Sequence, residues 1–203
     1  MGITFENCLV FQGCAQKTAE AAITVSALNS ITGLDIVINP VTREATAVVG
    51  GVTVPIAFEA CCQTASPFFR SSLLVDKIIN CGWVNGAILI RNLDTGVVLA
   101  CVNLALVFQE EQAAAGVLPT DTITEVVVKD EGSAICIVFS TNPVTGITEP
   151  LLIVKCVLLV QKTVTREQAV LPAICPSVAP CPTRRPVCPP DGSNQITIPR
   201  SIL

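Results

Sequence analysis

Short runs rich in β-branched residues, bounded by turn residues, recur along the chain and predict β-strands. They cover Ile23–Ser26, Leu34–Asn39, Val52–Val54, Ile88–Arg91, Thr122–Val128 and Ile135–Phe139. Several of these runs are apolar on both faces, which is typical of strands in the middle of a sandwich or in a sheet shared between subunits. The hydrophobic pattern therefore predicts an all-β fold, an antiparallel β-sandwich or jelly roll with extended terminal arms.

Three similar turn sequences separate apolar runs, and they favour antiparallel hairpins. They are Asn39–Arg43, Asn92–Gly96 and Asn142–Gly146. Asn closes an Asx-turn, Pro fixes φ at a corner and Gly supplies a positive φ. The recurrence is equally consistent with a weak internal repeat and with chance. Helix is scarce: Glu110–Ala115, followed by Gly116, predicts a short helical connector.

Proline density divides the chain into three parts. Eight prolines follow Leu171, and such a segment favours an extended arm over a place inside a sheet. Its last residues, 195–203, look like a short strand, which is suited to adding an edge strand to a neighbouring subunit. A tail packed on its own domain is the alternative. We therefore expect an N-terminal cysteine-bearing segment at 1–19, a β-sandwich domain at 20–165 and a proline-rich, cysteine-bearing arm at 166–203.

Composition indicates burial against other subunits. The chain is 51% hydrophobic and 14% charged, with a mean hydropathy of +0.65, yet no stretch reaches the roughly 20 apolar residues of a membrane helix. A monomer of this size normally covers its surface with charge. We therefore expect further copies of the chain as partners and no membrane span.

Several function classes are disfavoured. A net charge of −4 is unsuited to nucleic acid, because binding phosphates needs clustered Lys and Arg. The chain has no histidine, the side chain most used for proton transfer near neutral pH and a common metal ligand. Neither a C-x-x-C redox motif nor a glycine-rich phosphate loop is present. We expect no enzyme, no cofactor and no small-molecule substrate.

The most distinctive chemistry belongs to the eleven cysteines. An odd number leaves one for an intermolecular bond or a free thiol. Cys61 and Cys62 are adjacent, so in a strand they point to opposite faces and bond different partners. The candidates for cross-linking are Cys8, Cys14, Cys61, Cys62, Cys81, Cys175, Cys181 and Cys188. Flanking Val, Ile and Leu make buried free thiols an equal alternative for Cys101, Cys136 and Cys156.

Location follows from the same residues. The first residues lack the basic and apolar regions of a secretory signal, whereas disulfides are normally kept reduced in the cytosol. Metal-bound thiolates, a hyperthermophile's cytosol, or release by lysis followed by oxidation would each resolve this conflict. Zinc sites use C-x₂₋₄-C pairs, which are absent here. We therefore expect an extracellular, spore-surface or cell-surface location without a classical signal peptide.

Cysteine-bearing extended arms on a β-rich, tyrosine-free chain resemble the Ena-type subunits of bacterial endospore appendages, and more loosely other spore-surface proteins. The resemblance implies jelly-roll domains whose cysteine arm bonds to strand cysteines of the next subunit. Arm cysteines would be Cys8 and Cys14, or Cys175, Cys181 and Cys188; their partners would be among Cys61, Cys62, Cys81, Cys101, Cys136 and Cys156. In that family the adjacent cysteine pair lies in the N-terminal arm, whereas here it is internal and the proline-rich arm is C-terminal.

These observations predict a structural subunit that self-assembles into a disulfide-cross-linked extracellular or spore-surface fibre or coat, with a terminal arm complementing a neighbour. One alternative is a virion or cell-surface layer protein of a thermophile. Others are a small cysteine-based metal-binding module and a thiol-dependent enzyme.

Overall fold

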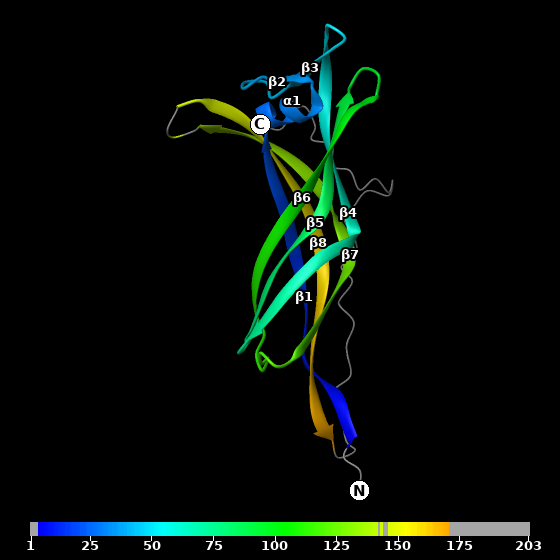
Figure 1. The fold of residues 1–203 in the computed structure, drawn as a ribbon, viewed down its shortest axis with the longest axis vertical. Helices are drawn as coiled ribbons and strands as arrows, with labels where there is room; N and C mark the ends of the chain where they lie inside the picture. The colour runs from blue at the N-terminus through cyan, green and yellow to red at the C-terminus, as the bar shows by residue number, and fades with distance from the viewer. Residues whose placement is uncertain (1–3, 142, 144–145, 171–203) are drawn as a thin grey trace.

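A computed structural model describes residues 4–141, 143 and 146–170, and it confirms the all-β prediction. The elements are β1 (Thr4–Thr24), α1 (Val25–Thr32), β2 (Asp35–Ile38), β3 (Ala45–Val49), β4 (Val52–Leu74), β5 (Lys77–Asn92), β6 (Val98–Ala113), β7 (Thr122–Thr141) and β8 (Thr148–Val170). The long strands run along the long axis of an elongated molecule, with α1, β2 and β3 gathered at one end (Figure 1).

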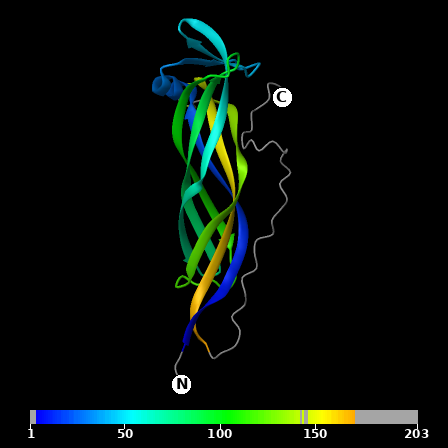
Figure 2. The ribbon, with the colours of Figure 1, turned by 90° about the vertical axis from the view of Figure 1, so that its right-hand side faces the viewer.

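The strands form one antiparallel sheet of eight strands that folds over itself into the two layers of a sandwich. Their order is β2-β3-β4-β5-β6-β1-β8-β7, but β6 and β1 are registered at a single described pair, Glu20 with Val107. We therefore distinguish the large sheet, β2 to β6, from the small sheet, β1, β8 and β7. The two sheets also approach each other at β4 and β7, where the Ser133 hydroxyl donates to the Ala60 carbonyl at 2.9 Å. Figure 2 shows the two layers from the side.

Alternation along the strands explains which residues are inside. In β5, every second residue from Ile78 to Asn92 points inward, and Ile78, Val84, Ile88 and Ile90 are fully buried. The buried apolar residues form two clusters. The larger fills the half of the sandwich nearest α1, and the smaller consists of Leu73, Ile78, Ala114, Val117 and Val164 near the opposite end.

Asparagine turns join the strands as the sequence predicts. The Asn39 side-chain carbonyl accepts from the backbone N–H of Val41 at 2.8 Å, and that of Asn92 accepts from Asp94 at 2.8 Å. Both are Asx-turns, so the predicted hairpin chemistry is confirmed at two of the three sites. The third, Asn142–Gly146, lies partly outside the described residues.

The helix prediction is wrong in position. Glu110–Ala113 continues strand β6, because Glu110 pairs in register with Asn80 of β5 and tertiary pairing overrides local propensity. The helix instead covers Val25–Thr32, where Ile23–Ser26 predicted a strand. Its ends are satisfied locally: the Thr24 hydroxyl accepts from the Ala27 N–H at 3.2 Å, and Gly33 closes the other end with a φ of 71°.

The N-terminal segment is part of the sandwich. The sequence places the start of the β-domain at residue 20, whereas β1 begins at Thr4 and pairs with β8 along its whole length. Thr4–Cys8 and Arg166–Val170 continue beyond the first residue of β7 as a two-stranded extension, which we call the terminal ribbon. Residues 166–170 of the expected arm therefore belong to β8, and residues 171–203 lie outside the described part of the chain.

A partly buried ion pair holds the base of the terminal ribbon. The Arg166 guanidinium donates to Asp121 through Nε at 2.7 Å and to the Gly116 carbonyl at 2.8 Å. The hydrogen bond from Arg166 lowers the pKa of Asp121 below its usual range. The pair thus ties the start of β7 to the segment of β8 that leaves the sandwich.

We expect Asp121→Asn to lower the free energy of unfolding at pH 7. Because the folded-state pKa of Asp121 is lowered, its contribution is complete above the unfolded-state value and is lost as pH falls through the folded-state value. Urea unfolding of both proteins should therefore give a constant difference above roughly pH 5 and a shrinking one below it. A difference that stays constant at acidic pH would contradict this role of the ion pair.

Candidate functional site

One disulfide lies inside the sandwich. Cys62 of β4 bonds to Cys156 of β8, with Cα atoms 6.2 Å apart and a separation of 94 residues in the sequence. It joins the large sheet to the small sheet, and Cys156 is completely buried. Cys62, a cross-linking candidate, is therefore bonded within the chain, and the interpretation of Cys156 as a buried free thiol is wrong.

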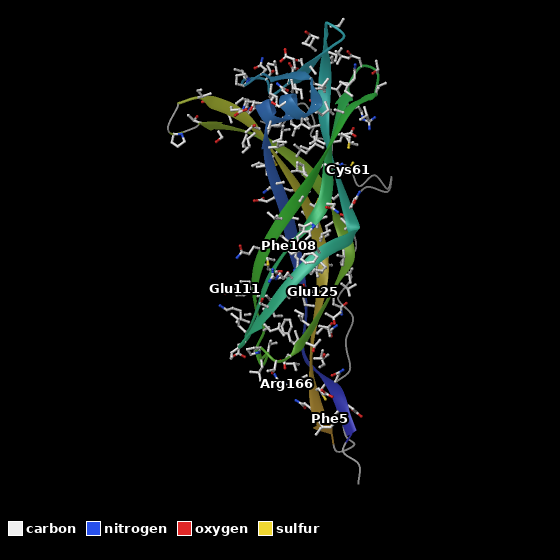
Figure 3. The ribbon with its side chains drawn as sticks, viewed as in Figure 1. Phe5, Cys61, Phe108, Glu111, Glu125 and Arg166 are labelled. Atoms are coloured by element: carbon white, nitrogen blue, oxygen red, sulfur yellow. A yellow bond between two sulfur atoms is a disulfide. The ribbon has the colours of Figure 1, made fainter. Side chains whose placement is uncertain are left out.

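The adjacent Cys61 has a different fate. It is a half-buried free thiol, because successive residues of a strand face opposite sides of the sheet. Burial raises the pKa of Cys61, and the neighbouring charges of Glu59 and Cys101 act in the same direction. Since the thiolate is the reactive form, Cys61 is poorly suited to disulfide exchange near neutral pH. Figure 3 labels its position on the flank of the molecule.

Three further cysteines of the described part are exposed free thiols: Cys81 of β5, Cys101 of β6 and Cys136 of β7. The expectation that Cys101 and Cys136 are buried is therefore wrong. Their strands are apolar enough to suggest burial, but each residue falls on the outward parity of its strand. Cys81 and Cys101 belong to the large sheet and Cys136 to the small sheet, so both sheets carry an accessible thiol.

The cysteines near the ends of the chain divide into two groups. Cys8 and Cys14 of β1 are both disulfide-bonded, and Cys8 is buried. Cys175, Cys181 and Cys188, the expected cysteines of the C-terminal arm, lie outside the described residues.

An exposed groove follows the seam where β6 meets β1. Phe68 and Trp83 stack on each other with ring centroids 4.0 Å apart, and they are 45% and 42% exposed. Val107, the register partner of Trp83, is 59% exposed. Cys81 lies beside these side chains and lines the same groove, and its Sγ donates to the Arg70 carbonyl at 3.6 Å. Apolar surface and a free thiol therefore meet at one place.

The interior of the sandwich contains a layer of charged and amide side chains between the two apolar clusters. We call it the interior polar layer; it comprises Lys17, Asn80, Glu110, Glu125 and Lys162. The Nζ atom of Lys17 lies 3.2 Å from Oε1 of Glu125 and 3.5 Å from Oε2 of Glu110. Nζ of Lys162 donates to the same Glu110 oxygen at 2.8 Å. Two cations and two anions thus balance inside the molecule.

Glu125 is the hub of this layer. Its Oε1 also accepts from the side-chain amide of Asn80, and its Oε2 accepts from the Ser71 hydroxyl at 2.6 Å. The amide nitrogen of Asn80 and the amine of Lys17 therefore contact one and the same carboxylate oxygen. Asn80 has no exposed surface, and its Oδ1 is a buried acceptor without a partner among the described residues.

Aromatic rings close the layer on the side of the larger core. Nζ of Lys17 lies 4.8 Å from the centroids of both Phe69 and Phe108. Gly82 separates these rings in register; a Cβ there would lie 2.6 Å from the Phe108 ring and 2.0 Å from the Phe68 carbonyl oxygen. Glycine at this position is required for the rings to fold over Lys17. Figure 3 shows Phe108 and Glu125 midway along the molecule.

Burial in the layer makes the protonated amine of Lys17 less stable than it is in water. Burial lowers the pKa of Lys17, and this effect outweighs the opposing attraction of Glu125. A desolvated ammonium loses the hydration that stabilises its charge. Lys17 is therefore closer to its nucleophilic form than a lysine in water.

None of these residues is predicted from the sequence above, although the parity of the two lysines along their strands indicates burial. Lys162 shares its parity with buried Leu158, Val160 and Val164 of β8. Lys17 shares its parity with Ala19, also fully buried. A charged residue on the inward parity of a strand needs a buried partner, and a search for such residues would have identified both lysines.

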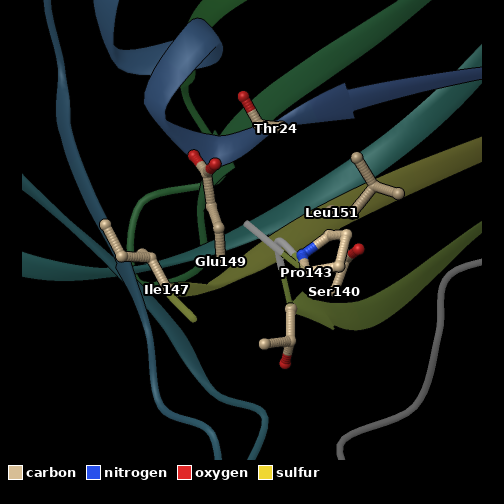
Figure 4. Close-up of a pocket in the computed structure, with 7 residues that line it drawn as sticks. Thr24, Ser140, Pro143, Ile147, Glu149 and Leu151 are labelled. Carbon is tan, nitrogen blue, oxygen red and sulfur yellow. The ribbon is translucent and has the colours of Figure 1, made fainter. Parts of the chain in front are cut away.

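A shallow hollow lies beside the β7–β8 hairpin, near its turn, between Thr24, Ser140, Ile147, Glu149 and Leu151 (Figure 4). Glu149 Oε1 accepts from the Ser26 N–H at 3.1 Å, and hydrogen bonds from Ser26 lower the pKa of Glu149. The Glu149 carboxylate caps the N-terminus of α1, so its role at this place is structural.

Two other kinds of site have no candidate within residues 4–141, 143 and 146–170. No group of three or more Cys, Asp or Glu side chains there is arranged to hold a metal ion. In the same part of the chain, no helix combines the length and apolar character needed to cross a membrane.

No protein-family model, curated protein or solved structure matches this chain.

Proposed function

We propose that the chain is a structural subunit that self-assembles into a disulfide-cross-linked fibre or coat at the surface of a cell or spore. The observation that supports this proposal most directly is the placement of the cysteines inside and outside the sandwich. One disulfide joins the sheets internally, whereas three free thiols of the described part face outward. An internal disulfide suits an oxidising environment, in which exposed thiols form bonds between molecules.

The groove at the β6–β1 seam supports a specific contact. The two strands are registered there only at Glu20 and Val107, so the rest of their facing edges is without a ladder partner and available to an added strand. Phe68, Trp83 and Val107 offer apolar surface beside the thiol of Cys81. An extended arm from a neighbouring copy would bury the aromatic rings and bring one of its cysteines to Cys81.

The chemistry of the cross-link requires an oxidant. Two thiols lose two protons and two electrons as the S–S bond forms, and molecular oxygen or a small disulfide accepts the electrons. The expected arm carries Cys175, Cys181 and Cys188 in its sequence, and one free thiol among them is sufficient for the bond to Cys81. The proposal assigns the arm segment 171–203 of one copy to the groove of the next.

The test is assembly of the full chain with single cysteine variants. After exposure to air, non-reducing gels of the wild type should show a ladder of covalent multimers that collapses with reductant. Negative-stain images should show fibres or sheets. Cys81→Ser should remove the ladder, because serine cannot form the bond.

Cys101→Ser is the matched control, since Cys101 is also an exposed free thiol of the large sheet but lies outside the groove. It should assemble like the wild type. A wild-type chain that remains monomeric in air would overturn the proposed function. A ladder that survives Cys81→Ser but not Cys101→Ser would overturn the role of the groove.

A further inference from the structure

We propose that Lys17 and Asn80 form an intramolecular isopeptide bond, promoted by Glu125, that covalently joins the small sheet to the large sheet. Lys17 belongs to β1 and Asn80 to β5, so the bond would cross the interior between the two layers. This modification is independent of the disulfides and of the proposed assembly.

The three reacting groups already converge. Nζ of Lys17 lies 3.2 Å from Oε1 of Glu125, and the Asn80 amide contacts the same oxygen. Holding a nucleophile, an electrophile and a proton carrier together replaces a bimolecular encounter by a unimolecular step. Asn80 and Lys17 are both buried, so surrounding side chains hold the two groups in place and keep them out of contact with water.

The surroundings favour amide formation over hydrolysis. Phe69 and Phe108 cover the Lys17 amine, and Leu73, Ile78 and Val164 belong to the apolar cluster on the other side of the layer. Excluding water prevents the competing attack on the Asn80 carbonyl carbon. It also favours the neutral amine, in agreement with the lowered pKa of Lys17.

The unpartnered Oδ1 of Asn80 completes the arrangement. The two ends of an asparagine amide have nearly the same shape, and rotation about the last side-chain torsion exchanges them. In the rotated form Oδ1 of Asn80 faces Glu125. A protonated Glu125 then donates a hydrogen bond to Oδ1 and polarises the Asn80 carbonyl. The buried acceptor thereby gains the hydrogen bond that it lacks.

The atoms balance without an oxidant or cofactor. The Lys17 ammonium first gives a proton to the Glu125 carboxylate, which leaves a neutral amine and a neutral acid. The Nζ lone pair then attacks Cγ of Asn80, and Glu125 transfers a proton from Nζ to Nδ2. The Cγ–Nδ2 bond breaks, the new Cγ–Nζ amide remains, and ammonia leaves.

The reaction also removes one of two buried ion pairs. Before it, Lys17 balances Glu125 while Lys162 balances Glu110. After it, Lys17 is an uncharged amide and Glu125 is a neutral acid, whereas Lys162 and Glu110 stay paired. Because ion pairs carry a large desolvation cost in an interior, the product is better suited to this environment.

The deciding experiment is the intact mass of the full chain, fully reduced and denatured. We expect it to be lower than the sequence mass by one ammonia, about 17 Da. Trypsin should release residues 1–43 joined to residues 78–91, because a modified Lys17 is no longer cleaved. An unmodified mass overturns the proposal, as does a loss of ammonia that maps to any other pair of residues.

Conservative variants test the assigned roles. Glu125→Gln should restore the unmodified mass, because an amide cannot carry the proton. Asn80→Asp should lose water in place of ammonia, which changes the loss to about 18 Da. Glu59→Gln is the control: this buried carboxylate pairs with Arg91 and should keep the loss of ammonia. A cross-link that persists in Glu125→Gln would overturn the assignment of Glu125.

Discussion

Replacing Cys62 and Cys156 together by alanine is expected to lower the free energy of unfolding by about 2–5 kcal/mol. The disulfide closes a long loop, because its two cysteines are 94 residues apart in the sequence, so it strongly restricts the unfolded chain. It also holds the large sheet against the small sheet at a completely buried position. Urea unfolding of the non-reduced proteins measures the difference.

Cys136→Ser is the control for this experiment, because Cys136 is an exposed free thiol and surface substitutions usually change stability by less than about 0.5 kcal/mol. Both measurements belong in a Cys81→Ser background, so that covalent multimers do not contribute. Equal stabilities of the double alanine variant and its parent would show that the bond does not hold the sheets together.

Lys162→Met is expected to lower the free energy of unfolding by about 3–5 kcal/mol. Lys162 is completely buried and donates to Glu110 at 2.8 Å. Its removal takes away the nearest cation of the Glu110 carboxylate, whose side chain is 22% exposed. An uncompensated buried charge is much more costly than a lost contact.

The double variant Lys162→Met and Glu110→Leu separates these two costs. Replacing both partners of a buried ion pair by apolar side chains is often neutral or stabilising. We therefore expect the double variant to recover most of the stability that Lys162→Met loses, measured by thermal and urea unfolding. Additive losses from the two substitutions would contradict this account of the interior polar layer.

The local pattern of hydrophobic and turn residues predicts where strands and turns of this fold lie, but it does not predict how long the strands are. Val52–Val54 and Ile88–Arg91 lie in β4 and β5, as predicted, yet β4 continues for 23 residues. The additional residues include polar ones that join the sheet because a paired neighbour is present along its length. Such pairing is a property of the assembled sheet and is invisible in a short window of sequence.

The candidate sites show the same division. The sequence predicts that Cys61 and Cys62 point to opposite faces, because neighbouring side chains alternate in any strand that contains both. The bond from Cys62 to Cys156 depends on which strand of the other sheet lies opposite, and so does the meeting of Lys17, Asn80 and Glu125. These residues come from β1, β5 and β7, and no local signal reports that those strands face one interior.

The pairing of β1 with β8 has a consequence for the order of events during synthesis. Apart from one pair with β6, β1 finds its ladder partner in the last described strand, from Thr4 opposite Val170 to Thr24 opposite Leu151. Contacts of such high sequence separation form late and slowly. The small sheet therefore cannot close until the chain has been synthesised through residue 170, so a polypeptide truncated before β8 lacks the finished surface that a neighbouring copy would recognise.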